Sequence, residues 1–209
     1  MPRVDFPLYL VTDRQQTGGR SLVPLVGQAA AGGLRAVQVR ERDLATRDLC
    51  AVSQELCSMM HAQGGRVMIN DRADLVLALG ADGVHLRADS LPVSVARRVL
   101  GSDRLIGVSA HSLDEVVRAE SEGADFAVLG PVYETPSKRD YGPPIGLHPL
   151  EEASRRCRIP VYAIGGITVA RAAEVRRAGA YGVAVVSAIL SAASVESATR
   201  QFLDALARA

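Results

Sequence analysis

Eight short runs of β-branched and other apolar residues recur along this chain, and they constrain its fold more than any other feature. Most of these runs are continuously apolar and do not alternate between apolar and polar residues. Such runs are typical of parallel strands that are covered on both faces. The predicted strands are residues 8–12, 36–39, 67–69, 83–86, 105–108, 126–129, 161–164 and 183–186.

The segments between these runs have helical periodicity, most clearly at residues 47–60, 113–122, 169–178 and 192–207. Glycine precedes several of the predicted strands and suits the left-handed C-terminal cap of a helix, because it has no Cβ to clash.

Strand, helix and glycine cap repeat about every 26 residues, which predicts an α/β fold of the (β/α)₈ TIM-barrel type near its lower size limit. A doubly wound open sheet is the alternative, although it normally has fewer strands. No linker or low-complexity tract divides the chain, so we expect residues 1–209 to form one barrel domain.

The charges are nearly balanced, with 24 lysines and arginines, 23 aspartates and glutamates and a formal net charge of +1. A nucleic-acid-binding protein usually carries a basic stripe, so we expect no nucleic-acid partner. The N-terminus does not resemble a signal peptide, and no apolar stretch approaches the roughly 18 residues of a membrane span. Cys50, Cys57 and Cys157 form no CxxC motif and suit a reducing compartment. We therefore expect a soluble cytoplasmic protein without a membrane partner.

In a TIM barrel, the residues directly after each strand form the active site. Gln38 lies in the second predicted strand and Arg40 and Arg42 follow it, and alternation places all three on one side. Two guanidiniums and an amide would clamp a phosphate there, because a planar guanidinium pairs with two oxygens at once. The alternative is a pair of surface arginines that bridge to Glu41 and Asp43.

Asn70 and Asp71 follow the third predicted strand. Asp71 suits Mg²⁺, a hard cation that binds one or two protein carboxylates. Helix capping is an equal alternative, because either side chain can accept hydrogen bonds from the first amides of the helix expected near Ala73.

Two histidines follow or end predicted strands. His85 lies inside an apolar run and is predicted to be structural. His111 follows the fifth strand and is the best acid/base candidate, because the reference pKa of histidine lies close to neutrality. The alternative is that Ser112 caps the next helix and His111 is only its neighbour. Ser109 could donate to a phosphate.

Three further loops complete the predicted mouth. The long loop after the sixth strand carries Thr135, Ser137 and Lys138, which predicts an anion-gripping lid, with a solvated charged loop as the alternative. Loops after the seventh and eighth strands usually bind phosphate in such barrels, and here they carry two glycines and a serine, with a simple tight turn as the alternative. Several anion-binding groups and a histidine at one mouth predict a phosphorylated small-molecule substrate. The residues of these two loops are Gly165, Gly166 and Ser187.

Seven motifs, in order, resemble the thiamine phosphate synthase/TenI superfamily. They extend from about Leu8 to Ile189 and read YLVTD, VQVRER, INDRADLVLALGADGVHL, GVSAHS, GPVYETPSK, AIGGI and VAVVSAI. The resemblance implies the same (β/α)₈ barrel and one of two activities. A synthase joins a pyrimidine methyl diphosphate to a thiazole phosphate and releases pyrophosphate with Mg²⁺. A thiazole tautomerase converts a thiazole carboxylate phosphate into its aromatic tautomer and needs no metal.

The resemblance also implies roles for individual residues. Gln38 and Arg40 match contacts to the pyrimidine and its diphosphate, and Asn70 and Asp71 match an asparagine and the first Mg²⁺ ligand. Arg42 stands where a lysine is usual. The other matched positions are Ser109, Thr135, Ser137 and Lys138 for the diphosphate and the loop, and Gly165, Gly166, Val186 and Ser187 for the thiazole phosphate.

The sequence departs from the synthase pattern after the fourth strand. Synthases usually read HLGQ, then an acidic residue, then the aspartate that is the second Mg²⁺ ligand. Here Arg87 and Ala88 replace glycine and glutamine, and Ser90 replaces the ligand aspartate. Asp89, one residue earlier, could substitute for it after a local shift.

These departures lead us to expect a thiazole tautomerase that has His111 as its proton-transfer residue and no cofactor. The alternative is a thiamine phosphate synthase with Mg²⁺ bound by Asp71 and Asp89. A third hypothesis is a non-catalytic protein that binds thiazole or thiamine phosphates. A homodimer would be unsurprising for this family.

Overall fold

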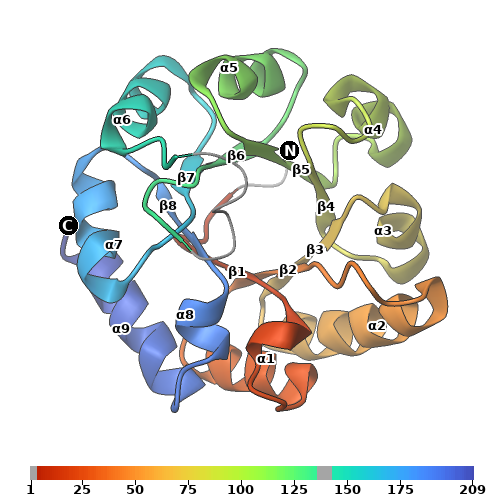
Figure 1. The fold of residues 1–209 in the computed structure, drawn as a ribbon. Helices are drawn as coiled ribbons and strands as arrows, with labels where there is room; N and C mark the ends of the chain where they lie inside the picture. The colour runs from red at the N-terminus through yellow and green to blue at the C-terminus, as the bar shows by residue number, and fades with distance from the viewer. Residues whose placement is uncertain (1–3, 136–142) are drawn as a thin grey trace.

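The chain folds into a closed barrel of eight parallel strands, each hydrogen-bonded to its sequence neighbours, with the last strand paired to the first (Figure 1). The structure is a computed structural model that describes residues 4–135 and 143–209. The prediction of a (β/α)₈ TIM barrel is confirmed. The strands are β1 (Leu8–Val11), β2 (Ala36–Val39), β3 (Arg66–Asn70), β4 (Gly83–Leu86), β5 (Leu105–Ala110), β6 (Phe126–Leu129), β7 (Val161–Ala163) and β8 (Gly182–Val185).

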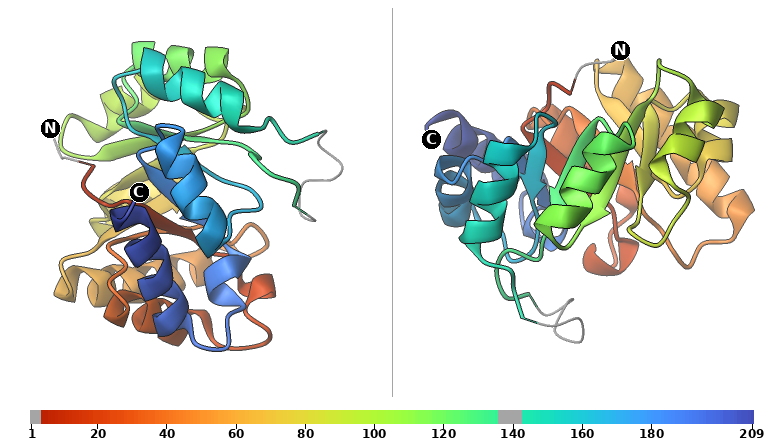
Figure 2. Two further views of the ribbon diagram at one scale, coloured as in Figure 1. Left: turned by 90° about the vertical axis from the view of Figure 1, so that its left-hand side faces the viewer. Right: turned by 90° about the horizontal axis from the view of Figure 1, so that it is seen from above.

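Helices surround the barrel and follow the strands in alternation (Figures 1 and 2). Helix α9 packs against α1 and α7 and so joins the two ends of the chain around the barrel. None of the described helices is long and apolar enough to cross a membrane. The helices are η1 (Arg14–Gln16), α1 (Leu22–Ala31), α2 (Thr46–Ala62), α3 (Ala73–Leu79), α4 (Val93–Leu100), α5 (Leu113–Ser121), α6 (Leu147–Arg156), α7 (Val169–Arg177), α8 (Ser187–Leu190) and α9 (Val195–Ala207).

Two apolar cores hold the fold together. The larger core fills the layer between the strands and the helices. The smaller core lies inside the barrel and is rich in aromatic rings. Phe6, just before β1, contacts the rings of Tyr9, Phe126 and Tyr162, and the Tyr162 hydroxyl donates to the Phe6 carbonyl at 2.6 Å. Residues 4–7 enter the barrel at the end opposite the loop after β6, so these rings fill its N-terminal end (Figure 2).

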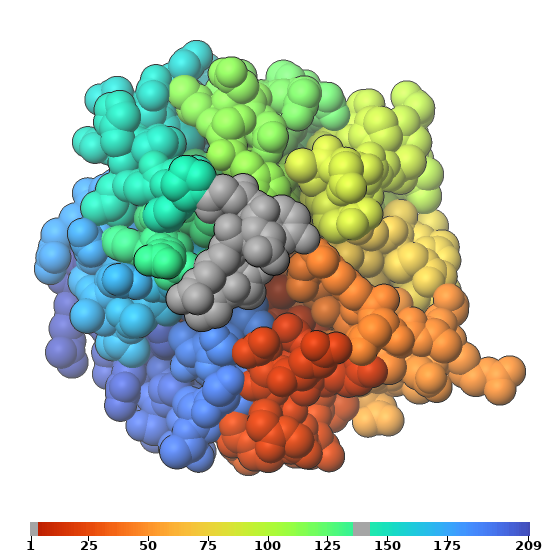
Figure 3. Space-filling model, in the orientation of Figure 1, coloured from red at the N-terminus to blue at the C-terminus, as the bar shows by residue number. Residues whose placement is uncertain are grey.

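Inward-facing positions change from apolar to polar toward the C-terminal ends of the strands. On β4, Gly83 faces the interior and His85 follows it two residues later, and on β2 Ala36 is followed by Gln38. Gln38 and His85 are buried. The barrel therefore has an apolar base and a polar mouth, and Figure 3 shows the mouth face with the orange loop after β2 and the yellow loop after β4 beside its centre.

The structure shifts some of the predicted boundaries. Strand β5 continues to Ala110, because Ala110 pairs with Leu129 of β6, so Ser109 lies within the strand and does not follow it. Helix α9 begins at Val195 because the Ser194 side chain caps it. The short helix α8 was not predicted.

Candidate active site

A chain of hydrogen bonds runs across the mouth from β2 to the loop after β4. The Gln38 amide donates to Asn70 Oδ1 at 2.9 Å, and the Asn70 amide donates to Asp71 Oδ2 at 3.2 Å. Arg87 closes the chain, because its Nε donates to Asp71 Oδ2 at 2.6 Å and its backbone N–H donates to Asp71 Oδ1 at 3.1 Å. We call Gln38, Asn70, Asp71 and Arg87 the polar chain.

Asp71 has an unusual backbone conformation. Its φ is +54°, the only positive φ among the non-glycine residues that the structure describes. Its N–H donates to the His85 carbonyl at 2.9 Å, which joins the end of β3 to β4. Non-glycine residues in this region are uncommon and concentrate at functional sites. The predicted capping role of Asn70 and Asp71 is wrong, because Arg72 is the N-cap of α3 and no side chain caps that helix.

The present arrangement does not fit the two-carboxylate Mg²⁺ site that the resemblance implies for a synthase. Both oxygens of Asp71 accept hydrogen bonds from Arg87, and Asp89 Oδ1 lies 3.5 Å from the same Nε. The guanidinium thus contacts both carboxylates and would repel a cation held between them. Ser90 contributes no charge. Within residues 4–135 and 143–209, no three His, Cys, Asp or Glu side chains are grouped to hold a metal ion.

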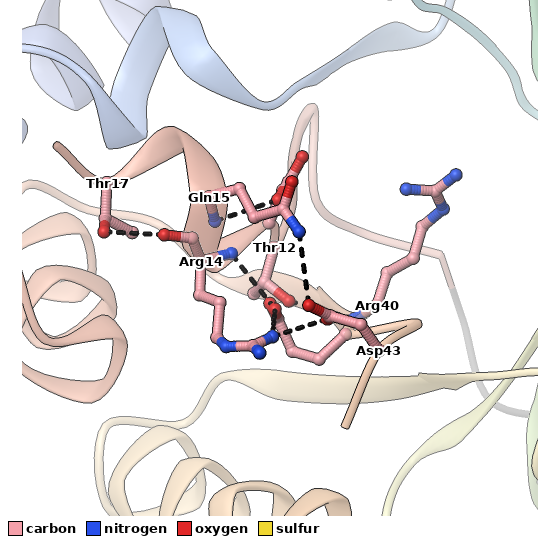
Figure 4. A network of polar contacts seen from close by, with 8 residues as sticks. Thr12, Arg14, Gln15, Thr17, Arg40 and Asp43 are labelled. Atoms are coloured by element: carbon pink, nitrogen blue, oxygen red, sulfur yellow. Dashed lines mark hydrogen bonds and ion pairs between the residues drawn. The ribbon is translucent and has the colours of Figure 1, made fainter. Parts of the chain in front are cut away.

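Arg40 lies at the mouth without a partner for its guanidinium among the described residues. Its backbone N–H donates to Thr12 Oγ1 at 2.9 Å, which joins the ends of β1 and β2. Desolvation, then the nearby charge of Arg42, lowers the pKa of Arg40 from its usual value. Figure 4 shows its side chain extending away from the surrounding polar network.

The acidic residues expected to pair with these arginines bind Arg14 instead. The Arg14 guanidinium contacts Asp43 at 2.5 Å, and its backbone N–H donates to Glu41 Oε2 at 3.0 Å (Figure 4). The alternative in which Arg40 and Arg42 bridge to Glu41 and Asp43 is therefore wrong. Arg42 lies beyond the end of β2 and is exposed, so strand alternation does not carry it into the barrel beside Gln38.

A cavity of about 320 Å³ adjoins the polar chain. Arg42 and Arg87 line it together with Asn70 and Asp71. Glu41 also lines it, and its buried Oε1 has no hydrogen-bond partner among the described residues. The wall of this cavity therefore offers guanidinium and amide donors to an anion, together with the carboxylates of Glu41 and Asp71, which oppose one.

His85 connects the interior of the barrel to the mouth. Its Nδ1 lies 3.3 Å from the Tyr9 hydroxyl, and its Nε2 lies 3.0 Å from Ser109 Oγ. Burial lowers the pKa of His85 to about 3, so the ring is neutral. A buried phenol needs an acceptor, and Nδ1 serves Tyr9, which leaves the ring proton on Nε2 to donate to Ser109. The Ser109 hydroxyl proton can then turn toward a phosphate. The side chains of Asn70, His85 and Ser109 belong to three adjacent strands.

His111 lies directly before the N-cap of α5, and contacts with the first turn of that helix fix its position. Ser112 caps that helix, because its hydroxyl accepts from the Glu115 N–H, as the structural alternative predicted. Glu115 Oε2 accepts from the His111 backbone N–H at 2.7 Å and lies 3.5 Å from His111 Nδ1. The imidazole is 48% exposed and contacts none of the other predicted site residues that the structure describes.

The loop after β6 packs on the turn after β7. The Tyr133 N–H donates to the Gly165 carbonyl at 3.1 Å, and the Tyr133 hydroxyl donates to Glu174 of α7 at 2.6 Å. Thr135 is half-buried at the end of the described part of this loop, whereas Ser137 and Lys138 lie outside the described residues.

Gly165 and Gly166 both have positive φ, +95° and +65°. A Cβ on Gly166 would lie 2.6 Å from the Glu134 carbonyl oxygen, so the close approach of the two loops requires glycine there. Val186 is the N-cap of α8, and Ser187 is its first residue. No described residue accepts from the backbone N–H of Gly166 or Ser187, so both amides remain available to a ligand.

Sequence reasoning missed three features of this mouth. For Arg87 the sequence indicated only the replacement of a glycine. It predicted a structural role for His85, and for Glu41 it offered only a salt bridge to an arginine of the same loop. The position of Arg87 could have indicated its contact with Asp71, because the two residues directly follow the neighbouring strands β4 and β3.

Comparisons with known proteins identify the family to which this chain belongs. The family described as thiamine monophosphate synthase matches residues 8–189. A protein of Geobacter sulfurreducens is 50% identical and covers 91% of this chain and 90% of its own length. Thiamine-phosphate synthase of Roseiflexus castenholzii is 45% identical and covers 96% of this chain and 88% of its own length.

Comparison with solved structures indicates the same family and the same fold. Thiamine phosphate pyrophosphorylase from Pyrococcus furiosus is 33% identical, covers 97% of this chain and 96% of its own, and superposes with a TM-score of 0.89. 3-Hexulose-6-phosphate synthase, at 18% identity and a TM-score of 0.74, shares the fold alone. The chain is therefore a member of the thiamine monophosphate synthase family.

Proposed function

We propose that this protein is a thiamine-phosphate synthase, which joins a pyrimidine methyl diphosphate to a thiazole phosphate. The names of its relatives support this alternative and give no support to the tautomerase that the sequence led us to expect. The observation that carries the proposal is the presence of two separate groups of anion-binding elements at one mouth. Arg40 and the polar chain lie after β2, β3 and β4, and Gly166 and Ser187 lie after β7 and β8. A tautomerase needs to hold only one phosphate.

The chemistry follows from this division. The cationic side would hold the diphosphate, while the amides after β7 and β8 would hold the thiazole phosphate. The bond between the pyrimidine methylene carbon and the diphosphate oxygen breaks, and its electron pair leaves with pyrophosphate. The thiazole nitrogen lone pair then forms the new carbon–nitrogen bond. Arg40 and the Ser109 hydroxyl would stabilise the charge that develops on the leaving group.

Pyrophosphate release tests the proposal directly. The purified protein is incubated with both substrates, and with each one alone, in the presence of Mg²⁺. Pyrophosphate should appear only with both substrates, in equal amounts with thiamine phosphate. Arg40→Gln should reduce kcat/KM by about 10- to 100-fold, because a charge-assisted contact to the leaving group is lost. Absence of pyrophosphate in the wild-type reaction would refute the synthase.

The tautomerase remains a second candidate because Asp71 is already paired with Arg87. It predicts aromatisation of the thiazole carboxylate phosphate without a second substrate, and His111→Ala should then slow that reaction roughly 10²–10⁴-fold. Tight binding of thiazole phosphate without turnover in either assay would identify a binding protein.

A further inference from the structure

The positively charged guanidinium of Arg87 contacts two carboxylates at the mouth, those of Asp71 and Asp89. Its Nε is 2.6 Å from Asp71 Oδ2 and 3.5 Å from Asp89 Oδ1. The chain after β4 turns sharply here, because the Ser90 N–H donates to the Arg87 carbonyl at 3.2 Å. This turn and the unusual backbone of Asp71 together position the ion pair.

The guanidinium retains unused donors after it has bound Asp71. Only Nε and the backbone N–H of Arg87 contact Asp71, and no described residue accepts from Nη1 or Nη2. The side chain is 44% exposed and lines the cavity of about 320 Å³ beside Arg42. A guanidinium presents its terminal nitrogens as a planar fork that matches two phosphate oxygens.

Three guanidiniums and two carboxylates influence one another at this place. Desolvation is the main cause of the lowered pKa of Arg40, the charges of Arg42 and Arg87 lower it further, and the carboxylates of Asp13 and Asp71 raise it, so the three guanidiniums are close enough to repel one another. Within the described part of the chain, neither Arg40 nor Arg42 has a salt bridge. A multiply charged phosphate group would relieve this repulsion.

We propose that Arg87 binds the diphosphate of the substrate directly and supplies positive charge that a divalent cation would otherwise supply at the Asp71 carboxylate. This inference rests on the proposed function for the identity of the diphosphate substrate. It makes pyrophosphate binding at this mouth independent of divalent metal, with Asp71 acting to orient the guanidinium.

Calorimetric titration with inorganic pyrophosphate tests the inference without turnover. In EDTA, the wild-type protein should bind pyrophosphate, and Arg87→Gln should bind it about 10- to 100-fold more weakly. Arg98→Gln is the matched control, because Arg98 is an exposed arginine on the following helix α4. Its affinity should equal that of the wild type. Wild-type binding that occurs only when Mg²⁺ is added would overturn the inference.

A double variant separates direct contact from simple neutralisation of Asp71. If Arg87 only masks the Asp71 carboxylate, Asp71→Asn combined with Arg87→Gln should restore wild-type affinity, and that result would overturn the proposal. If Arg87 contacts the diphosphate, the double variant should remain weak. Conversely, Arg87→Gly combined with Ser90→Asp should make pyrophosphate binding depend on Mg²⁺, because two free carboxylates then face each other.

The steady-state assay keeps this inference distinct from the proposed function. Failure of the wild-type protein to release pyrophosphate from the two substrates, with Mg²⁺ or with EDTA, would refute the synthase. The titration would still decide whether Arg87 binds pyrophosphate.

Discussion

His85 combines a structural and a positioning role in one side chain. It is 2% exposed and lies between the Tyr9 hydroxyl and Ser109. Gly107 on the neighbouring strand makes room for it, since a Cβ there would lie 2.8 Å from His85 Nδ1. The ring is thus fixed from both sides and can hold the Ser109 hydroxyl in one orientation.

Burial of His85 makes the stability of the protein depend on pH. Its pKa is lowered to about 3, whereas an unfolded histidine has a pKa near 6.5. Below pH 6.5 the unfolded chain takes up a proton that the folded protein does not, so folding stability decreases as pH falls from 6.5 toward 3. The contribution approaches about 1.4 kcal/mol per pH unit.

Urea unfolding at pH 7.5, 6.0 and 5.0 measures this dependence. His85→Asn should reduce the decrease in unfolding free energy between pH 6.0 and 5.0 by about 1 kcal/mol. His148→Gln is the control for removal of a histidine from an exposed position. Equal slopes in the wild type and His85→Asn would contradict the prediction.

At the scale of the elements, two Gly-Ala-Asp segments, residues 80–82 before β4 and 123–125 before β6, have a common structural role. Asp82, before β4, accepts from the Val67 N–H at 2.8 Å, and Asp125, before β6, accepts from the Ile106 N–H at 2.7 Å. Each aspartate thereby ties the start of its own strand to the preceding strand. Asp125 also pairs with Arg97 of α4 at 2.6 Å.

Removal of Asp125 should therefore destabilise the fold. Asp125→Ala leaves the Ile106 N–H without its acceptor and removes the carboxylate that pairs with Arg97, whose other hydrogen bonds to backbone carbonyls remain, and should lower the free energy of unfolding by about 2–3 kcal/mol. Asp103→Ala, an exposed aspartate nearby in the chain, should change it by less than about 0.5 kcal/mol. Urea denaturation followed by circular dichroism measures both variants, and equal midpoints would refute this role.

The elements were largely predictable from the sequence, whereas several contacts at the mouth were not. Continuous apolar runs bounded by glycine mark parallel strands, so all eight were found. The ion pair of Arg87 with Asp71 depends on the positive φ of Asp71, which local sequence does not specify. The contact of Tyr9 with His85 crosses the barrel interior between residues 76 positions apart, and no periodicity reports such a contact. Helix α8 was missed because four residues are too few to show a helical period.

At the scale of the whole molecule, the aromatic rings at the N-terminal end of the barrel connect the first strand of the chain with the sixth and the seventh. Phe6 is fully buried against Tyr9, Phe126 and Tyr162. These residues lie on or beside β1, β6 and β7, so their packing supports closure of the barrel.

Truncation of this ring cluster should affect global stability. Phe6→Ala should lower the free energy of unfolding by about 3–5 kcal/mol, the usual cost of deleting a buried aromatic ring. Leu77→Ala serves as the control, because Leu77 is 52% exposed, and it should cost less than about 0.5 kcal/mol. Thermal unfolding compares the two, and a similar melting temperature for both variants would show that the rings do not support closure.

The filled end of the barrel also determines the side from which ligands can reach the polar residues. Because Phe6 and its neighbouring rings fill the barrel axis at one end, ligands can approach the polar residues only from the mouth. In the synthase reaction proposed above, two substrates and two products would all enter and leave by that face. A product that stays bound there would exclude the next substrate, and its release would then compete with substrate binding for the same space.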